Sequence, residues 1–437
     1  MSALAKYYRQ NGLCVAGYDR TASSVTDTLM ELGIDIHFND DVLAIPAEFT
    51  SEKEGKLVIY TPAVPTNHAE LNFLRNQGYT VIKRSEALGR ISEKHRTIAV
   101  AGTHGKTTTS SILAHILKQT ELDCTAFLGG MSTNYNSNFL SSTTSPFMVV
   151  EADEYDRSFL KLSPEMAIVT SMDPDHLDIY GDAAELNRSF QEFASKLGAN
   201  GTLIFKKGLP LENGPYKKLS YSISEAADYQ VQNYSITDGR FSFDLNSPFG
   251  KMTNVDFGMP GIHNMENALA AIAASQQLGV SETELREALT SYQGVKRRFE
   301  LILNENGVTF IDDYAHHPTE LDACISSVKK MYPNRKVTGV FQPHLFTRTR
   351  DNMSEFAQSL SELDQLYLLD IYPARELPIE GVTSQVLLDQ TQLDDKTLIT
   401  KNEVAERIAA DRPEVLLTLG AGDIDRLVQP IKNALTA

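Results

Sequence analysis

The chain has 437 residues, 42% of them hydrophobic, and a formal net charge of -17 at pH 7. This length suits about three domains of ~100–200 residues, and the hydrophobic content argues against wholesale disorder. The acidic balance argues against nucleic acid as a main partner, because phosphate backbones would be repelled, but a small anionic ligand needs only a local positive pocket.

Residues 1–94 alternate short apolar runs with helical patterns, which is typical of βαβ units, and predict a Rossmann-like domain. Strands are expected at 13–19 and 56–64, with a helix at 25–33 that ends at Gly33. The first twelve residues already predict a helix, so the chain begins inside a βαβ unit rather than before one.

Residues 95–293 predict a central α/β domain with a parallel sheet like that of P-loop ATPases. Strands are expected at 97–102, 147–153 and 166–172. The helix after the first of them has one apolar stripe, formed by Ile112, Leu113, Ile116 and Leu117.

The end of this block changes character. Residues 234–245 alternate polar and apolar side chains around Asp238-Gly239, which predicts a small antiparallel hairpin at the edge of the same sheet. Helices are expected at 267–279 and 281–292, and the second opens with Ser281 and Glu284 in capping-box spacing.

Residues 294–437 predict a second Rossmann-like domain, with strands at 308–314, 336–342, 365–372, 397–400 and 414–420. In doubly wound sheets, ligands lie at the carboxyl ends of the strands. The polar residues that follow the predicted strands are therefore the candidates for a functional site.

A phosphate-binding loop is predicted between the strand at 97–102 and the helix after it. Its residues are Gly102, Thr103, His104, Gly105, Lys106, Thr107 and Thr108. Glycines let backbone N–H groups approach phosphate oxygens, and the helix N-terminus adds positive potential. Lys106 would reach the outer phosphates and Thr107 would ligate Mg²⁺. Val100 stands where the full motif has its first glycine, so the loop is a shortened variant. The alternative is a tight turn with a surface lysine.

Two acidic clusters follow neighbouring strands. The first contains Glu151, Asp153, Glu154 and Asp156, and the second contains Asp173, Asp175, His176 and Asp178. Both are expected at the sheet edge that carries the phosphate loop, where carboxylates suit Mg²⁺. His176 is a candidate metal ligand, although an isolated histidine is more often structural.

Nine segments, in order along almost the whole chain, resemble the Mur ligases of peptidoglycan synthesis. They are GTHGKTTT, VVEADEYDRSFL, TSMDPDHLDIY, PGIHNMENALAAIA, KRRFE, DDYAHHPTEL, FQPHLFTRTRD, DIYPARELPI and LTLGAGDID. The resemblance implies three domains that bind a UDP-sugar (1–94), ATP (95–293) and an amino acid (294–437). It also implies that ATP phosphorylates the carboxylate of UDP-N-acetylmuramate and that the amine of L-alanine attacks the acyl phosphate.

The resemblance assigns roles to residues that match the family's segments. Lys106, Glu151 and His176 would be catalytic, and Thr107, Glu151 and His176 would hold magnesium. Asn267 would contact adenine, Arg298 a nucleotide phosphate and Asp313 the ribose. Without the other segments, an ordinary helix start near His263 and Asn264 would explain the region of Asn267 equally well.

For the amino acid, the resemblance points to Tyr314, His344 and Arg348. A guanidinium suits a carboxylate because it can engage both oxygens. The alternative for Arg348 is a solvated helix N-terminus, where basic charge opposes the helix dipole.

The sequence departs from the usual family pattern in two places, and from that of some members in a third. It starts at MSALA, without the first strand and glycine-rich turn of the family, so either this sequence starts late or the UDP-sugar site is incomplete, and Asp19 is the candidate uridine contact. Leu345 stands where the family often has arginine, leaving Arg348 or Arg375 for the carboxylate. Gln191 stands where some members have a carbamylated lysine, so no carbamate is expected.

Three separated cysteines fit a reducing compartment, and neither a signal peptide nor a membrane span is expected. We therefore expect a cytoplasmic enzyme without membrane insertion, as a monomer or weak homodimer. Two alternatives stay open at this point: a related ligase with a tripeptide acceptor, and a nucleotide-binding protein without ligase activity.

Overall fold

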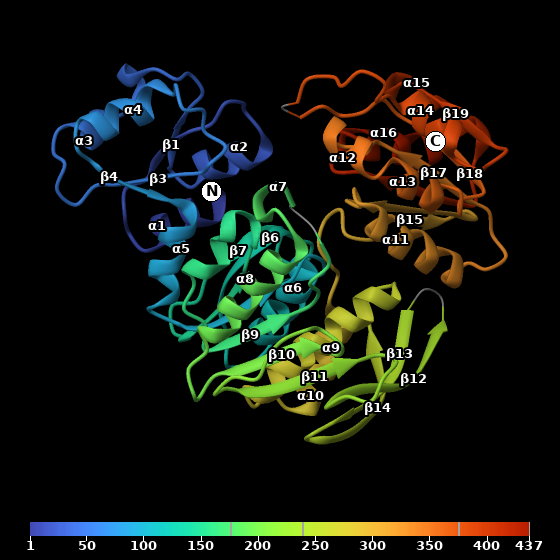
Figure 1. Cartoon of the computed structure of the whole chain (residues 1–437), viewed down its shortest axis with the longest axis horizontal. Helices are drawn as coiled ribbons and strands as arrows, with labels where there is room; N and C mark the ends of the chain where they lie inside the picture. The colour runs from blue at the N-terminus through green and yellow to red at the C-terminus, as the bar shows by residue number, and fades with distance from the viewer. Residues whose placement is uncertain (175–176, 238–239, 375, 437) are drawn as a thin grey trace.

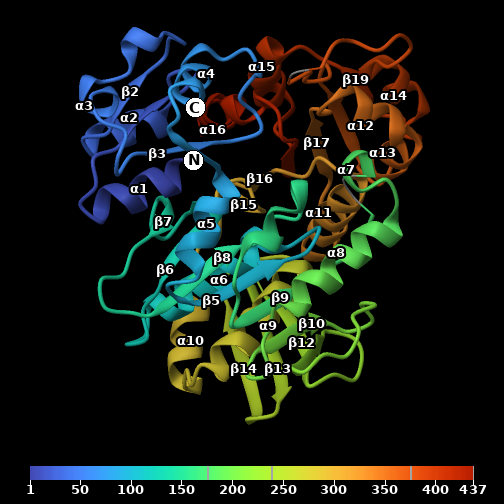
Figure 2. The same cartoon turned by 60° about the vertical axis from the view of Figure 1, so that its left-hand side comes forward.

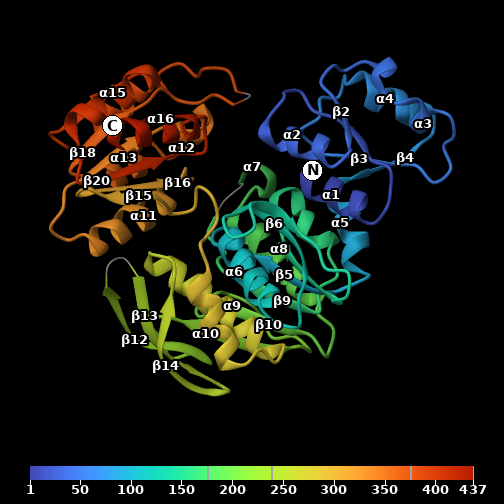
Figure 3. The ribbon, with the colours of Figure 1, turned by 180° about the vertical axis from the view of Figure 1, so that it is seen from behind.

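The computed structural model describes residues 1–174, 177–237, 240–374 and 376–436. Its strands form four sheets, of which the two smallest lie in an N-terminal unit and the other two in a central and a C-terminal unit (Figure 1). Figure 3, the view from behind, shows the N-terminal and C-terminal units lying beside each other above the central unit. The expected mixed α/β architecture is confirmed, whereas the domain boundaries at 94 and 293 stay predictions.

The N-terminal unit pairs its four strands as two parallel ladders, β1 with β2 and β3 with β4. Its elements are α1 (Ser2–Gln10), β1 (Ala16–Tyr18), α2 (Ser24–Glu31), β2 (Asp35–His37), η1 (Val42–Ala44), α3 (Ala47–Thr50), β3 (Leu57–Tyr60), α4 (Ala69–Asn76), β4 (Thr80–Lys83) and α5 (Arg84–Ser92). The strand expected at 13–19 is shorter than predicted because Leu13 and Cys14 are exposed and unpaired in the ladder.

Helix α1 packs on the central unit rather than on its own neighbours alone. Leu4 is buried in the same core as Phe127 and Phe139, and the ring of Tyr7 lies 5.5 Å from that of Phe127. Lys6 donates to Ser137 Oγ at 3.4 Å. Figure 2 shows α1 beside β7, so the start of the chain is tied to the edge of the central sheet.

The central unit contains a ten-stranded sheet in the order β14-β13-β12-β11-β10-β9-β5-β8-β6-β7. Its strands are β5 (Arg96–Ala101), β6 (Thr125–Ser132), β7 (Ser137–Leu140), β8 (Phe147–Glu151), β9 (Met166–Val169), β10 (Thr202–Lys206), β11 (Lys217–Ser222), β12 (Tyr229–Thr237), β13 (Arg240–Ser247) and β14 (Gly250–Phe257). Its helices are α6 (Lys106–Lys118), η2 (Tyr155–Lys161), α7 (Leu177–Tyr180), α8 (Ala183–Ser195), α9 (Ile262–Gln277) and α10 (Glu282–Ser291).

Strands β5, β6, β8, β9, β10, β11 and β12 run parallel, and β12, β13 and β14 form an antiparallel extension at one edge. This confirms the predicted elaboration, although the turn at 238–239 lies outside the described residues. The predicted stripe of α6 is wholly buried against α9. The Ser281–Glu284 capping box also forms.

The C-terminal unit has a six-stranded sheet in the order β15-β16-β20-β17-β18-β19, parallel except for β15. Its strands are β15 (Glu300–Glu305), β16 (Val308–Asp313), β17 (Val337–Phe341), β18 (Gln365–Leu368), β19 (Lys396–Leu398) and β20 (Val415–Leu419). Its helices are α11 (Pro318–Met331), α12 (Phe346–Asp351), α13 (Met353–Leu360), α14 (Ser384–Gln390), α15 (Lys401–Asp411) and α16 (Asp425–Thr436). Separate cores lie on the two faces of this sheet, as expected for a doubly wound unit.

Candidate active site

The phosphate loop lies where β5, in the middle of the central sheet, gives way to α6. Gly102 and Gly105 have φ angles of 137° and 82°, which side chains rarely adopt. A Cβ at Gly102 would collide with Thr170, and one at Gly105 would lie 2.6 Å from Asn267 Oδ1. Gly105 caps α6 without any side-chain hydrogen bond, so no side chain competes for the first N–H groups of the helix. The tight turn therefore leaves an anion-binding helix N-terminus open.

Lys106 is not the surface lysine of the alternative interpretation. Its Nζ donates to the carbonyl oxygens of Gly102 and Thr103 at 2.6 and 3.3 Å, and to both carboxylate oxygens of Glu154 at 2.9 and 2.7 Å. Burial works against its charge, but the carboxylates of Glu154 and Glu151 outweigh it, so the pKa of Lys106 lies above its ordinary value. The lysine is held charged beside the loop.

The sequence shows Glu154 as one of four acids in a cluster, and it does not predict the pairing with Lys106. It follows β8 and is fully buried. Burial raises its pKa, against the opposing effect of Lys106. Tyr180 donates to its backbone carbonyl at 2.5 Å. A buried carboxylate three residues after a strand has no signal in a single sequence that separates it from its solvated neighbours.

Glu151, the last residue of β8, lies on the same edge as the loop. Its carboxylate accepts the backbone N–H of Gly129 at 3.0 Å, and a Cβ on Gly129 would collide with that carboxylate. Thr107, the second residue of α6, is buried. The described residues contain no group of three metal-ligating side chains. The candidate ligand His176 lies outside the described residues.

The end of β9 supports the loop from the other side. Ser171 Oγ accepts the backbone N–H of His104 at 2.7 Å and hydrogen-bonds Thr103 Oγ1 at 2.9 Å. Thr170 Oγ1 donates to the carbonyl of His104. These two hydroxyl residues were not predicted, although their position after a strand beside the loop could have indicated them.

Asn267, predicted to contact adenine, lies next to the phosphate loop. It is buried on α9, and its Oδ1 accepts a hydrogen bond from Thr109 at 3.2 Å. The contact explains why Gly105 must lack a side chain, and it brings together two segments 158 residues apart. His263, at the start of α9, has a pKa lowered to about 4 by burial and by Arg298.

Arg298 and Asp313 lie where the chain enters the C-terminal unit, Arg298 just before β15 and Asp313 at the end of β16. The Arg298 guanidinium lies 5.0 Å from the Tyr314 ring centre and 3.6 Å from Glu320 Oε1. The two Asp313 oxygens accept the backbone N–H groups of Phe299 and Ala315 at 2.6 and 2.7 Å. Burial raises the pKa of Asp313 to about 6, against the effect of Arg298. The Asp313 carboxylate therefore holds Phe299, just before β15, close to Ala315, just after β16.

The residues predicted for the amino acid lie together on the C-terminal unit. His344 Nδ1 lies 3.4 Å from Arg348 Nη1, and its ring stacks on Tyr372. His316 packs edge-on against both Tyr314 and His344. Burial, together with His316 and Arg348, lowers the pKa of His344 to about 4. The imidazole is therefore neutral near pH 7 and does not repel the guanidinium of Arg348.

Leu345 has a φ of 72°, an uncommon value for a side-chain residue. It begins α12, and its carbonyl accepts bonds from the backbone and hydroxyl of Thr349. The strained position sets His344 and Arg348 on one side of a tight turn. Arg375, the other guanidinium considered for the carboxylate, lies outside the described residues.

Asp19 lies apart from this group, at the end of β1 in the N-terminal unit. It is exposed, and its carboxylate accepts the backbone N–H of Thr21 at 3.3 Å. Its own N–H donates to the carbonyl of His37 at the end of β2. It therefore marks the carboxyl edge of the first parallel ladder.

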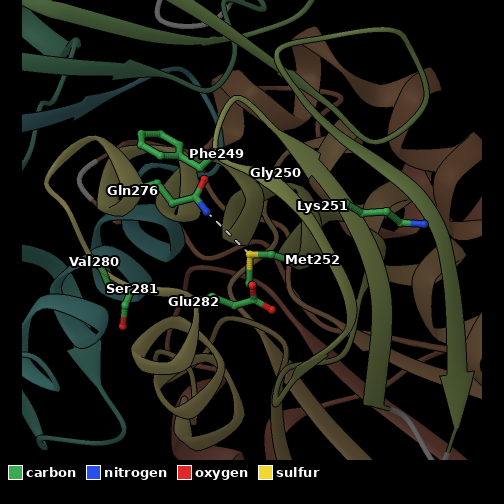
Figure 4. Close-up of a pocket in the computed structure, with 8 residues that line it drawn as sticks. All are labelled: Phe249, Gly250, Lys251, Met252, Gln276, Val280, Ser281 and Glu282. Atoms are coloured by element: carbon green, nitrogen blue, oxygen red, sulfur yellow. Dashed lines mark hydrogen bonds between the residues drawn. The ribbon is translucent and has the colours of Figure 1, made fainter.

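The hollow shown in Figure 4 is a different place. It measures about 210 Å³ and lies between β14 and the helices α9 and α10, lined by Phe249, Gly250, Lys251, Met252, Gln276, Val280, Ser281 and Glu282. Strand β14 is six strands away from β5 in the sheet. It therefore does not belong to the phosphate-loop site.

Gln191 has a structural contact that fits its departure from a carbamylated lysine. Its amide donates to the carbonyl of Pro210 at 2.6 Å and accepts the N–H of Glu212 at 3.0 Å. The side chain thus holds the segment after β10 against α8.

Family models match three consecutive parts of the chain. They are "Mur ligase family, catalytic domain" at residues 1–96, "Mur ligase middle domain" at 100–275 and "Mur ligase, glutamate ligase domain" at 297–422. Curated relatives match over the full length. The chain is 50% identical to a UDP-N-acetylmuramate–L-alanine ligase of Porphyromonas gingivalis over 440 residues, covering all of this chain and 96% of that protein. It is also 50% identical to the enzyme so named from Parabacteroides distasonis, covering 95% of it.

Solved structures agree with these matches. A UDP-N-acetylmuramate–alanine ligase from Thermotoga maritima superposes with a TM-score of 0.82 at 25% identity, covering all of this chain and 96% of that one. A MurF ligase from Thermotoga maritima, solved in complex with ADP, gives a TM-score of 0.65 at 17% identity and covers 89% of this chain and 96% of that one, which supports the fold alone. In the described parts of the chain, no helix is long and apolar enough to cross a membrane.

Proposed function

The chain belongs to the Mur ligase family and joins L-alanine to UDP-N-acetylmuramate, and we propose that the residues around the phosphate loop carry out this ATP-dependent step of peptidoglycan precursor synthesis. The observation that carries the function is full-length identity of 50% to ligases of this name. The buried loop with its charged lysine supplies the chemical reason.

The reaction has two covalent steps. A carboxylate oxygen of the sugar substrate forms a bond to the terminal phosphorus of ATP, and ADP leaves. The amine of L-alanine then attacks the acyl carbon, a tetrahedral intermediate forms, and phosphate leaves with the bonding electrons as the amine loses a proton. The first step activates a carboxylate that would otherwise resist attack by an amine.

The loop residues fit a triphosphate. Gly102 and Gly105 leave backbone space, and the uncapped start of α6 offers N–H donors to phosphate oxygens. Lys106 would exchange its carboxylate partner Glu154 for phosphate oxygens and offset charge on the transferring group. We propose that His104, Thr103 and Thr108 line the same phosphate site.

We propose that Thr107 and Glu151 hold Mg²⁺ together with His176. Hydroxyl and carboxylate oxygens suit this ion, which usually keeps water and phosphate ligands and does not need an all-protein cage. When bound, the ion would neutralise part of the phosphate charge. Gly129 keeps room for the Glu151 carboxylate, which is consistent with a functional rather than merely solvated acid.

For the rest of the nucleotide, we propose that Asn267 contacts adenine and Arg298 a phosphate. Asn267 can both donate and accept at the base edge, and it already lies beside Gly105. Asp313 would contact the ribose only if a lone pair not used by Phe299 and Ala315 faces it.

For the amino acid, we propose that Arg348 binds the carboxylate while His344 and Tyr314 shape the pocket. The neutral His344 leaves Arg348 as the cation of this pair. The N-terminal unit would take the UDP-sugar, with Asp19 near the uridine. We further propose that the protein works in the cytoplasm, since its three cysteines are free, and that it is a monomer or weak homodimer.

The test is ADP release by purified protein with each substrate omitted in turn. Release that requires both UDP-N-acetylmuramate and an amino acid, with L-alanine preferred over a tripeptide acceptor, is the expected result. ADP release that ignores both substrates, or preference for the tripeptide, would contradict the proposed function.

A further inference from the structure

The carboxylate of Glu320 lies where the C-terminal unit meets the phosphate loop. Glu320 is in the first turn of α11, and its side chain is 18% exposed. Its Oε2 lies 3.1 Å from His316 Nδ1 and accepts the backbone N–H of His316 at 3.0 Å. Its Oε1 lies 3.6 Å from Arg298 Nη1 and 3.8 Å from His104 Nδ1. One carboxylate thus lies near His104 of the phosphate loop, Arg298 before the C-terminal sheet and His316 beside the proposed amino-acid residues.

His104 is fixed at its backbone and faces the other unit with its ring. Ser171 and Thr170 hold its N–H and carbonyl. Within the described chain, its Nδ1 is buried without a hydrogen bond, and Glu320 Oε1 lies just beyond hydrogen-bond distance. Its Nε2 lies 3.8 Å from Asp173.

A buried polar atom without a partner is costly, and a small approach of α11 would give it one. Contacts in sites without ligands are often long and shorten when the substrate is bound. Burial disfavours the Glu320 charge, but His316, His104 and Arg298 outweigh it, so its pKa lies well below its ordinary value. The carboxylate is therefore available as an acceptor.

We propose that Glu320 is a positioning residue that docks the C-terminal unit on the phosphate loop through His104 and, in the same movement, orders Arg298 and His316. The proposal rests on the proposed function, because it assumes that the loop binds ATP. His316 contacts both Tyr314 and His344, so Glu320 connects the nucleotide site to the amino-acid site.

A purely structural role for Glu320 would give different results. An acidic residue in the first turn stabilises a helix by its charge, and Glu320 also accepts a backbone N–H there. That role would change the melting temperature of the protein but would not depend on the residue at position 104.

The experiment compares the wild-type protein with Glu320→Gln, His104→Gln, the double variant and Ser327→Ala. Ser327 on α11 hydrogen-bonds His263 on α9 at 3.3 Å, which is a contact between the two units away from the loop, so Ser327→Ala controls for a general loosening of the units. Calorimetry with a nonhydrolysable ATP analogue, titration of UDP-N-acetylmuramate and KM for L-alanine are measured, with melting curves for each protein.

We expect each single glutamine variant to bind the ATP analogue about tenfold more weakly and to raise KM for L-alanine, with unchanged affinity for the UDP-sugar. The double variant should be no weaker than the worse single variant, since both remove one contact. Ser327→Ala should bind the analogue as the wild type does.

Additive losses in the double variant, or an equal loss in Ser327→Ala, would overturn the docking role. If Glu320→Gln melts too early to measure, His104→Gln decides through the amino-acid site: an unchanged KM for L-alanine overturns the proposal, and a raised KM with unchanged UDP-sugar affinity supports it. A wild-type protein that does not bind the analogue would refute the proposed function instead, which keeps the two failures distinguishable.

Discussion

Nζ of Lys106 lies 2.7 Å from Oε2 of Glu154, in a pair whose side chains are 14% and 1% exposed. A lysine that is to meet phosphate therefore already has an anionic partner before the nucleotide arrives. The buried carboxylate keeps the ammonium charged and aimed at the loop carbonyls of Gly102 and Thr103. If the loop binds ATP as proposed, phosphate oxygens would replace the Glu154 carboxylate around Lys106.

Lys106→Ala should reduce ADP release by about 10³-fold or more, because it removes a charge that meets the transferring phosphoryl group. It should also destabilise the protein by about 3–5 kcal/mol, since Glu154 is left buried without its counter-ion. Adding Glu154→Gln should restore most of the stability and none of the activity. Urea unfolding and ADP release measure the two effects, and recovery of turnover in the double variant would contradict the role of Lys106.

Gly129→Ala tests the proposed magnesium position. A methyl group at residue 129 would collide with the Glu151 carboxylate and remove the hydrogen bond that orients it. We expect half-maximal activity to need about tenfold more Mg²⁺, with KM for L-alanine unchanged. Gly198→Ala is the matched control, because that exposed glycine has open space around it and does not need a positive φ. Equal Mg²⁺ dependence in the two variants would remove Glu151 from the metal site.

The sequence predicted the parts of the site that lie within one short segment. The turn at 102–107 and the acid after β8 are local patterns, and the parallel order of β9, β5 and β8 brought them to one edge as expected. The buried stripe of α6 was also visible, because its period follows one face of a helix.

Contacts between segments far apart in the sequence could not be predicted in the same way. Glu154 and Glu320 stand in segments with several other charged residues, and only packing decides which carboxylate is buried beside Lys106 or faces His104. The division of the N-terminal strands into two ladders, β1 with β2 and β3 with β4, was likewise not predicted.

The stabilisation that comes from a neutral His115 should decline as the pH drops from about 6.5 to 4, while Asp313, whose pKa is raised to about 6, acts in the opposite direction. Burial lowers the pKa of His115 to about 4, so between the two values the unfolded chain binds a proton that the folded chain does not. The contribution of His115 to the free energy of unfolding is therefore fully present above pH 6.5 and is lost as the pH falls, by up to about 3 kcal/mol. His263 has a pKa lowered to the same value and adds to the slope.

His115→Gln should flatten this slope. The histidine, in the last turn of α6, hydrogen-bonds Tyr135 and Ser291 at 3.0 Å each, and a neutral amide can replace it. Urea unfolding at pH 7 and pH 4.5 gives the measurement. An unchanged pH dependence in the variant would show that His115 is not kept neutral in the folded protein.

Arg348→Gln tests the amino-acid site, because Arg348 is the guanidinium that the C-terminal unit places beside the neutral His344. Losing a charge-assisted contact to a carboxylate should raise KM for L-alanine by about 10–100-fold, with affinity for the ATP analogue unchanged. Arg350→Gln is the control, since Arg350 lies two residues further along α12, is 53% exposed and pairs with Asp351. Equal KM values in the two variants would move the carboxylate site away from Arg348, and the effect on KM rather than kcat distinguishes binding of the amino acid from damage to the phosphoryl step.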